Sequence, residues 1–282
     1  MNIKISLVLF VLCLFPFASS AQWLYEGKKI IGYFDNEFEK DSTYLLYGDK
    51  VILRDQASSN GKALDTLSIA TSVKIISKSS KKIELNGIEW NWYKVKSKHG
   101  TGYVAGGLLA SDFRKINGGI YLVCQSQEKD KVFAKIRYLK NDMYYGKKIL
   151  LSNSSFTLDV YGNRGLTGIE SMLGLSFYAD ACGVDGGIHY IFNDGKKLYD
   201  AIHCPAYSDG PYYFAEELEF PDNHKSESVT YKRFYGEPYE NDDQDFNDDD
   251  YISIDKEVTY TLSLKWNGDH FEPDVKKLKF ED

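Results

Sequence analysis

The sequence predicts an all-β protein, in which a small barrel is followed by a larger antiparallel β domain. Aromatic residues make up 15% of the chain, including 22 tyrosines, and this composition is more typical of strands than of helical bundles. From residue 47 onward, short apolar runs alternate with turns rich in Gly, Asn and Ser, which is the pattern of a small barrel. A hydrophobic content of 43% is enough for a packed core.

The first 21 residues have the layout of a secretory signal peptide. Lys4 precedes an apolar stretch over residues 5–18, and small residues follow up to Ala21. The stretch is shorter than the roughly 20 residues that a membrane-spanning helix needs. Cys13 lies inside it and lacks the small preceding residue of a lipoprotein signal. We therefore expect cleavage after Ala21 and a periplasmic or secreted protein without a stable membrane span.

Length and charge limit the remaining possibilities. The 282 residues are enough for one large or two modest domains. The net charge is −7, and it becomes −8 when Lys4 leaves with residues 1–21, since that segment contains no acid. An acidic chain has no general electrostatic attraction for nucleic acid. We expect no nucleic-acid partner.

Residues 46–112 contain the strand and turn signals of the barrel, after a leader segment over residues 22–45. The predicted strands are residues 51–54, 72–76, 83–85, 90–96 and 103–104. Asn86-Gly87 predicts a tight hairpin turn, and Gly100-Thr101-Gly102 predicts a second turn.

The order of these motifs resembles the bacterial SH3-like (SH3b) family. The motifs are Val51-Ile52-Leu53-Arg54, Val73-Lys74-Ile75, Trp92-Tyr93-Lys94-Val95-Lys96 and Gly100-Thr101-Gly102-Tyr103-Val104, with Leu67 between the first two. The resemblance covers residues 46–112, which is 67 of the 282 residues. It implies an SH3-like barrel that recognises cell-wall peptide or a protein partner. Gln56-Ala57-Ser58 replaces the family's usual Pro-Ser pair, so that turn is expected to differ.

Strand alternation suggests a ligand-binding surface on the barrel. Side chains alternate between the two faces of a strand, so Val95 and Tyr93 share the inner face while Trp90 and Trp92 share the other. Tyr103 follows the second turn beside them. Flat aromatic faces suit short peptides or glycan strands, and we therefore predict Trp90, Trp92 and Tyr103 as ligand-binding residues. The alternative is that the leader or the C-terminal half covers the tryptophans.

Residues 113–282 form a β-rich C-terminal domain with no family resemblance. The predicted strands are residues 119–125, 131–139, 148–151, 156–161, 176–178, 188–192, 197–202, 229–235, 257–266 and 276–280. Asn193-Asp194-Gly195 and Asn267-Gly268 predict hairpin turns. An antiparallel meander, a sandwich and a partial propeller-like stack all fit this pattern.

Three cysteines remain after residue 21. Cys182 and Cys204 flank the predicted hairpin at Asn193-Asp194-Gly195, so we predict a disulfide between them. In the chain-entropy model, closing this loop stabilises the fold by roughly 3 kcal/mol. Cys124 lies in a strand of alternating apolar residues and is predicted to be a buried free thiol.

Catalytic and metal sites are not predicted. A cysteine peptidase needs its nucleophile at a helix start, whereas Cys182 lies in a glycine-rich turn and its only possible partners are His189 and His203. A zinc site would combine these three residues with Cys204, but His203 and Cys204 are adjacent and face opposite sides of a strand. We predict no catalytic residue, no metal and no cofactor.

Residues 237–250 form an acidic stretch with eight carboxylates. A solvated hairpin loop is the favoured interpretation. Weak calcium binding is the alternative, although the stretch lacks the turn glycine and the final glutamate of an EF-hand loop.

Two classes of function remain open. The first is an exported, non-enzymatic binding protein of the cell envelope, whose SH3b-like module recognises cell-wall peptide, peptidoglycan or an envelope protein. The second is a cell-wall hydrolase with an unrecognised site in residues 113–282. In the second case, histidines and carboxylates of that region are expected to converge in a pocket.

Overall fold

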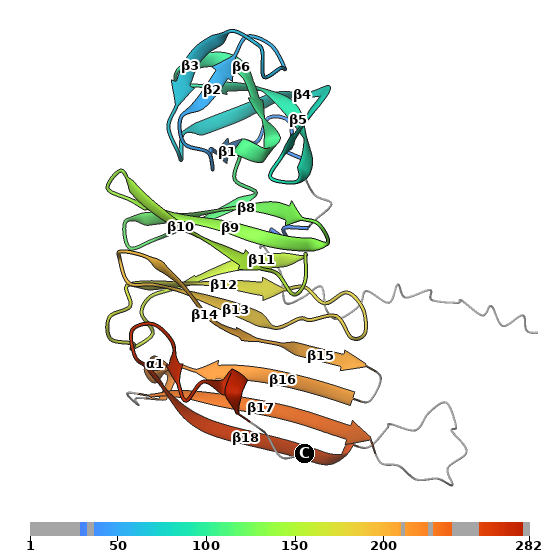
Figure 1. Cartoon of the computed structure of the whole chain (residues 1–282), viewed down its shortest axis with the longest axis vertical. Coiled ribbons are helices and arrows are strands. Elements are labelled where there is room, and N and C mark those ends of the chain that lie inside the picture. Colours follow the sequence, from blue (N-terminus) through green and yellow to red (C-terminus); the bar gives the residue numbers. More distant parts are fainter. Residues whose placement is uncertain (1–28, 33–36, 210–211, 225–227, 239–253, 279–282) are drawn as a thin grey trace, which may run out of the picture.

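The computed structural model describes residues 29–32, 37–209, 212–224, 228–238 and 254–278. The chain forms a barrel followed by three antiparallel sheets that lie one below the other (Figure 1). The all-β prediction is confirmed. The predicted signal peptide and most of the acidic stretch lie outside the described residues. No helix among the described residues is long and apolar enough to cross a membrane.

The barrel sheet has the strand order β1-β4-β5-β6-β2-β3. Its strands are β1 (Thr43–Leu45), β2 (Val51–Arg54), β3 (Ala63–Leu67), β4 (Ser72–Leu85), β5 (Ile88–Ser97) and β6 (Gly100–Ala105). Inward-facing side chains of these strands form one core, which includes Leu53, Val73, Tyr93 and Val95. The sheet begins at Thr43, within the segment that the sequence assigned to the leader.

Two sequence expectations in the barrel differ from the structure. Residues 77–82, which were expected to interrupt the strand, belong to β4, and register shifts between β4 and β5 accommodate them. Gly100 begins β6 instead of forming a turn. The Asn86-Gly87 turn is confirmed, and both residues have positive φ, 57° and 74°. Its glycine is required, because a Cβ on Gly87 would lie 2.0 Å from the Gln127 carbonyl oxygen.

Three meander sheets follow the barrel, and each has its strands in chain order. The first contains β7 (Asp112–Ile116), β8 (Gly119–Glu128), β9 (Lys131–Lys140) and β10 (Met143–Leu150). The second contains β11 (Phe156–Tyr161), β12 (Ser171–Phe177), β13 (Ile188–Asn193) and β14 (Leu198–Cys204). The third contains β15 (Ala206–Asp209), β16 (Tyr212–Glu219), β17 (Val229–Pro238), β18 (Ile254–Trp266) and β19 (Phe271–Glu272), with the short helix α1 (Pro221–His224) between β16 and β17.

Each sheet packs its apolar side chains on the next one. One core joins the first and second sheets, and a separate core joins the second and third. The second sheet is therefore buried on both faces, which explains the apolar run in β12: Leu173 and Leu175 contact one core while Met172 contacts the other. A small cluster around Tyr47, Leu122 and Cys124 joins the barrel to the first sheet. Of the architectures left open, the antiparallel meander forms, as three successive sheets with a core between each neighbouring pair.

The predicted disulfide between Cys182 and Cys204 is absent from the structure, and both residues have free thiols. Cys204 lies on β14 with its side chain in the core between the second and third sheets, where burial raises the pKa of its thiol. Cys182 is exposed in the loop before β13. Flanking the same hairpin did not bring the two side chains together, because Cys204 faces a core and Cys182 lies exposed in the loop. Cys124 is a buried free thiol, as predicted, and burial raises its pKa to about 12.

These positions predict selective thiol reactivity. In protein lacking residues 1–21, we expect a water-soluble alkylating reagent to modify Cys182 alone under native conditions, because thiolates react and buried thiols stay protonated. Peptide mapping by mass spectrometry measures the modification. Denatured protein is the control, in which Cys124 and Cys204 should also react. Rapid native labelling of Cys204, or a peptide that joins Cys182 to Cys204, would contradict the structure.

Candidate functional site

Trp90 lies in the barrel core, not on a ligand-binding surface. Only 1% of its surface is exposed. Its ring stacks on Phe38 with the centroids 6.4 Å apart, and its Nε1 donates a hydrogen bond to the Leu85 carbonyl oxygen at 3.1 Å. The prediction that Trp90 contacts a ligand is therefore wrong, because its side chain is covered and shares one core with Val95.

The cover comes from the segment before the barrel. The backbone N–H of Phe38 donates to the Tyr93 hydroxyl at 3.2 Å, and the Phe38 ring meets Tyr93 edge-on at 5.4 Å. Gly107 closes another side, since a Cβ there would lie 2.7 Å from Trp90 Nε1. The leader thus supplies part of the barrel core, which is the alternative that the sequence had left open.

Trp92 belongs to a different cluster from Trp90, with Ala57 and Ala105 buried beside it and Tyr103 packed against them. Trp92 is 5% exposed and lines a hollow of about 320 Å³, which we call the Trp92 pocket. The other residues that line it are Ala57, Ser58, Ser59, Lys81, Lys82 and Ile83. The structure therefore brings together two of the three predicted ligand residues, Trp92 and the half-buried Tyr103.

Local hydrogen bonds shape both walls of the Trp92 pocket. On one side, Arg54 donates from Nη1 to the Gly61 carbonyl oxygen at 2.6 Å, and Asp55 Oδ1 accepts from the Lys62 N–H at 2.8 Å. These bonds close the loop over residues 55–62, where the sequence departs from the family pattern. On the other side, Asn91 Nδ2 donates to the Ser79 carbonyl oxygen at 2.9 Å and holds β4 against β5.

The charge at the Trp92 pocket is carried by two lysines of β4. Lys82 forms an ion pair with Glu89 at 2.5 Å. Lys81 is exposed and makes no ion pair among the described residues. This pocket suits a short peptide that carries a carboxylate. The indole forms an apolar floor, the two serine hydroxyls offer hydrogen bonds, and the Lys81 ammonium group can pair with the carboxylate. The sequence predicted the aromatic floor of the pocket. It contained no motif that identified the rim residues Ser58 and Lys81 as ligand-binding residues.

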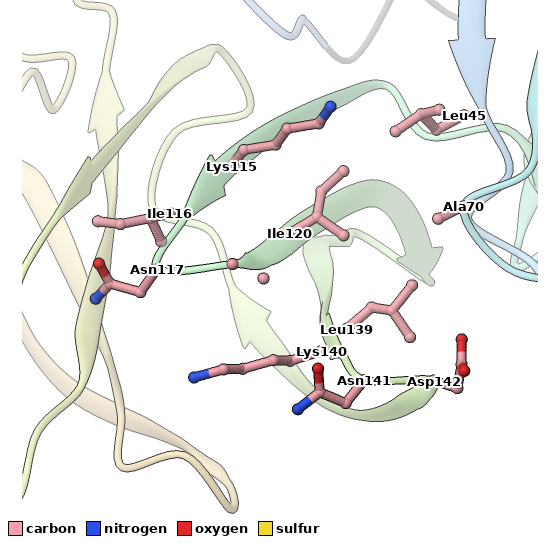
Figure 2. A pocket seen from close by; sticks show the side chains of 12 residues that line it. Leu45, Ala70, Lys115, Ile116, Asn117, Ile120, Leu139, Lys140, Asn141 and Asp142 are labelled. Atoms are coloured by element: carbon pink, nitrogen blue, oxygen red, sulfur yellow. The ribbon is translucent and has the colours of Figure 1, made fainter.

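A larger hollow lies where the barrel meets the first sheet, and we call it the junction groove. It consists of two adjoining parts of about 700 and 910 Å³ that share Ala70 and Asp142. Figure 2 shows the first part, in which Lys115, Ile120 and Leu139 of the first sheet lie opposite Leu45 and Ala70 of the barrel. Sequence reasoning did not identify this groove.

Histidines and carboxylates also converge on the second sheet. His189 and His203 are partners across β13 and β14, and their rings stack with the centroids 5.4 Å apart. Nε2 of His189 lies 2.6 Å from Asp200 Oδ1, and Nε2 of His203 lies 2.7 Å from Asp185 Oδ2. Among the described residues, no group of three or more His, Cys, Asp or Glu side chains is arranged to hold a metal ion.

Asp185 is the most strongly bonded member of this cluster. Its carboxylate accepts hydrogen bonds from His203, from the Ser152 hydroxyl and from the backbone N–H groups of Gly187 and Ala206. Burial by itself would raise the pKa of Asp185, but these bonds outweigh it and lower the pKa to about 2.

There is no catalytic triad in the arrangement of Ser152, His203 and Asp185. Ser152 Oγ lies 3.3 Å from His203 Nε2, and Asp185 contacts the same nitrogen. A serine nucleophile needs the base at one imidazole nitrogen and the orienting carboxylate at the other. The cluster therefore fixes the loop before β13 to β14.

Comparison with protein families assigns part of the chain. Residues 49–110 match the model of the bacterial SH3 domain. The match spans β2 to β6 and includes every residue that lines the Trp92 pocket. The resemblance expected from the sequence is confirmed for this stretch. No curated protein and no solved structure matches the chain.

Proposed function

We propose that this protein is an exported, non-enzymatic binding protein of the cell envelope, whose bacterial SH3 domain recognises cell-wall peptide at the Trp92 pocket. The observation that carries the proposal is the pocket itself, in which a nearly buried indole lies below a rim with serine hydroxyls and a lysine that has no ion-pair partner among the described residues. Cell-wall peptides are short and carry carboxylates. Their small side chains fit a hollow of about 320 Å³, and a carboxylate fits the ammonium group of Lys81.

The proposal is tested by retention on purified peptidoglycan. Trp92 is unsuitable for the test, because it is 5% exposed and its replacement would disturb packing. We expect Lys81→Glu to reduce retention by about five- to tenfold, since it reverses the charge that meets a ligand carboxylate at an exposed rim. Sedimentation of bound protein against increasing amounts of peptidoglycan measures the effect.

Lys50→Glu is the matched control for this pull-down. Lys50 is an exposed lysine of the same domain outside the pocket, and its replacement changes the net charge by the same amount. Equal retention of wild type, Lys81→Glu and Lys50→Glu would remove the Trp92 pocket as the wall-binding site. An equal loss in both variants would indicate general charge attraction instead.

Export is the second part of the proposal, and residues 1–21 support it. We expect the mature protein to begin at Gln22, because small residues precede this position as they precede signal-peptidase cleavage sites. N-terminal sequencing of protein from the periplasm or the culture medium measures the start. Protein from either compartment that begins at Met1 would contradict the expected cleavage.

The arrangement of residues in the second sheet favours binding over hydrolysis. The histidines and carboxylates of the C-terminal half do converge, as the hydrolase alternative requires. However, Ser152 and Asp185 share one nitrogen of His203, and this geometry lacks the separate base and orienting contacts of an acyl-transfer site. Cys182 lies in the same loop as Asp185, but its side chain is exposed.

A further inference from the structure

The junction groove is positively charged although the protein is acidic. Five lysines line it, and Asp142 is the single carboxylate among its lining residues. The lysines are Lys74, Lys96, Lys98, Lys115 and Lys140. The whole chain has a net charge of −7, so this excess of positive charge is local and does not follow from the composition.

Three of these lysines have no counter-ion within the part of the chain that the structure describes. Lys74 pairs with Asp41 at 3.1 Å, and Lys140 pairs with Glu170 at 3.1 Å. Lys96, Lys98 and Lys115 are exposed and form no ion pair among the described residues. The groove therefore keeps three cations available to a ligand.

The placement of Lys96 is unfavourable in the free protein. Lys74 and Lys96 are register partners on neighbouring strands, and like charges directly opposite each other destabilise a sheet. Asp41 offsets part of this repulsion from the side of Lys74. An anion bound in the groove would offset the remaining repulsion between Lys74 and Lys96. This gain would make ligand binding more favourable.

The floor of the groove is apolar, and its borders are rigid turns. Leu45 and Ala70 of the barrel face Ile120 and Leu139 of the first sheet (Figure 2). The β7–β8 and β9–β10 turns border the floor, and each is a two-residue hairpin turn with positive φ. An extended peptide alternates its side chains, so it can direct acidic groups to the lysines and small apolar groups to this floor.

We propose that the junction groove is a second binding site of this protein and that it takes an extended acidic peptide segment of a partner protein. The groove shares no lining residue with the Trp92 pocket. The proposal is therefore independent of cell-wall recognition by the SH3 domain. Charge complementarity selects the partner, because three available ammonium groups surround an apolar floor that suits short side chains.

The test uses the full mature chain and fluorescein-labelled ten-residue peptides. One peptide alternates Ala and Glu, and its matched control alternates Ala and Gln. We expect the acidic peptide to bind with an anisotropy change that weakens as salt is raised, because these exposed charges are screened. Lys96→Glu, Lys98→Glu and Lys115→Glu combined should weaken binding by about ten- to a hundredfold. The Lys96 change also replaces the repulsion with an opposite-charge pair.

The control variant carries the same charge change elsewhere: Lys62→Glu, Lys147→Glu and Lys196→Glu, all at exposed positions outside the groove. It should bind like the wild type. Absence of binding, equal binding of the Ala-Gln peptide, or equal weakening in both triple variants would overturn the proposal. Inorganic phosphate that competes fully at millimolar concentration would also overturn it, by assigning the groove to small anions.

Sedimentation velocity decides whether the acidic peptide comes from a second copy of this chain. Residues 237–250 carry eight carboxylates, so this stretch of a second copy is the acidic segment to test against a partner's peptide. If self-association appears at low salt and is lost both in the groove variant and when the Asp residues of that stretch are replaced by Asn, the occupant is a second copy and not a partner protein. A monomer at all concentrations, together with peptide binding, supports the proposal.

Discussion

Trp90→Ala is expected to destabilise the barrel by about 3–5 kcal/mol, as large-to-small substitutions of buried aromatic residues do. Trp90 is 1% exposed, and its indole fills the space between Phe38 and the glycines at 106 and 107. Its removal leaves a cavity and breaks the hydrogen bond to the Leu85 carbonyl oxygen. Urea unfolding followed by far-UV circular dichroism measures the change in free energy.

Tyr103→Ala is the control for this experiment. Tyr103 is a half-buried aromatic residue of the same barrel, and its truncation should cost clearly less than that of Trp90. Phe38→Ala should destabilise the barrel in the same direction as Trp90→Ala, because the two rings cover each other. A loss below about 1 kcal/mol for Trp90→Ala would contradict its place in the core. It would restore Trp90 as a ligand-binding residue.

Asp185→Ala is expected to have the second-largest effect, a loss of about 3 kcal/mol. The substitution removes an acceptor of four hydrogen bonds, one of them from His203, and leaves the half-buried Gly187, His203 and Ala206 donors without this partner. The loop before β13 should detach from β14, which hydrogen exchange at Gly187 and Ala206 would detect. Asp180→Ala, at an exposed position of the same loop, is the matched control and should change little.

The same carboxylate gives the fold an acid-sensitive component. Asp185 has its pKa lowered from 3.8 to about 2 in the folded state, so its contribution is present above pH 3.8 and is lost as the pH falls toward 2. The shift corresponds to about 2 kcal/mol. Wild-type protein should therefore lose more stability between pH 4 and pH 2 than Asp185→Asn does. Parallel pH dependence of the two proteins would contradict the role of this carboxylate.

The Trp92 pocket and the junction groove depend on different parts of the fold. The Trp92 pocket lies within residues 49–110, so one domain holds all its lining residues. The junction groove exists only while the barrel stays docked on the first sheet. Asn86 and Gln127 maintain part of that contact, because the Gln127 N–H donates a hydrogen bond to the Asn86 carbonyl oxygen at 2.8 Å. Gly87 permits this close approach, since a Cβ there would lie 2.0 Å from the Gln127 carbonyl oxygen. Separation of the barrel from the stack should therefore abolish acidic-peptide binding first.

The sequence by itself determined the features that depend on a few neighbouring residues. Asn86-Gly87 and Asn193-Asp194-Gly195 specify their hairpin turns, because their residues tolerate positive φ or bond back to the turn. The ordered SH3 motifs identified the barrel, and the alternating apolar residues around Cys124 predicted its burial. Each turn, each motif and each apolar run spans only a few neighbouring residues, so no distant contact was needed to recognise them.

Only the tertiary structure decided which surfaces are covered and which side chains meet. Strand alternation correctly separated Trp92 from Val95 but was wrong for Trp90, which shares one core with Val95. It also could not show that Phe38, 52 residues before Trp90, would cover that side chain. It placed Cys182 and Cys204 beside one hairpin, yet the cores between sheets determined the direction of Cys204. The lysines of the junction groove come from strands and turns as far apart as Lys74 and Lys140. Their approach depends on how whole sheets stack, and a local pattern contains no information about that packing.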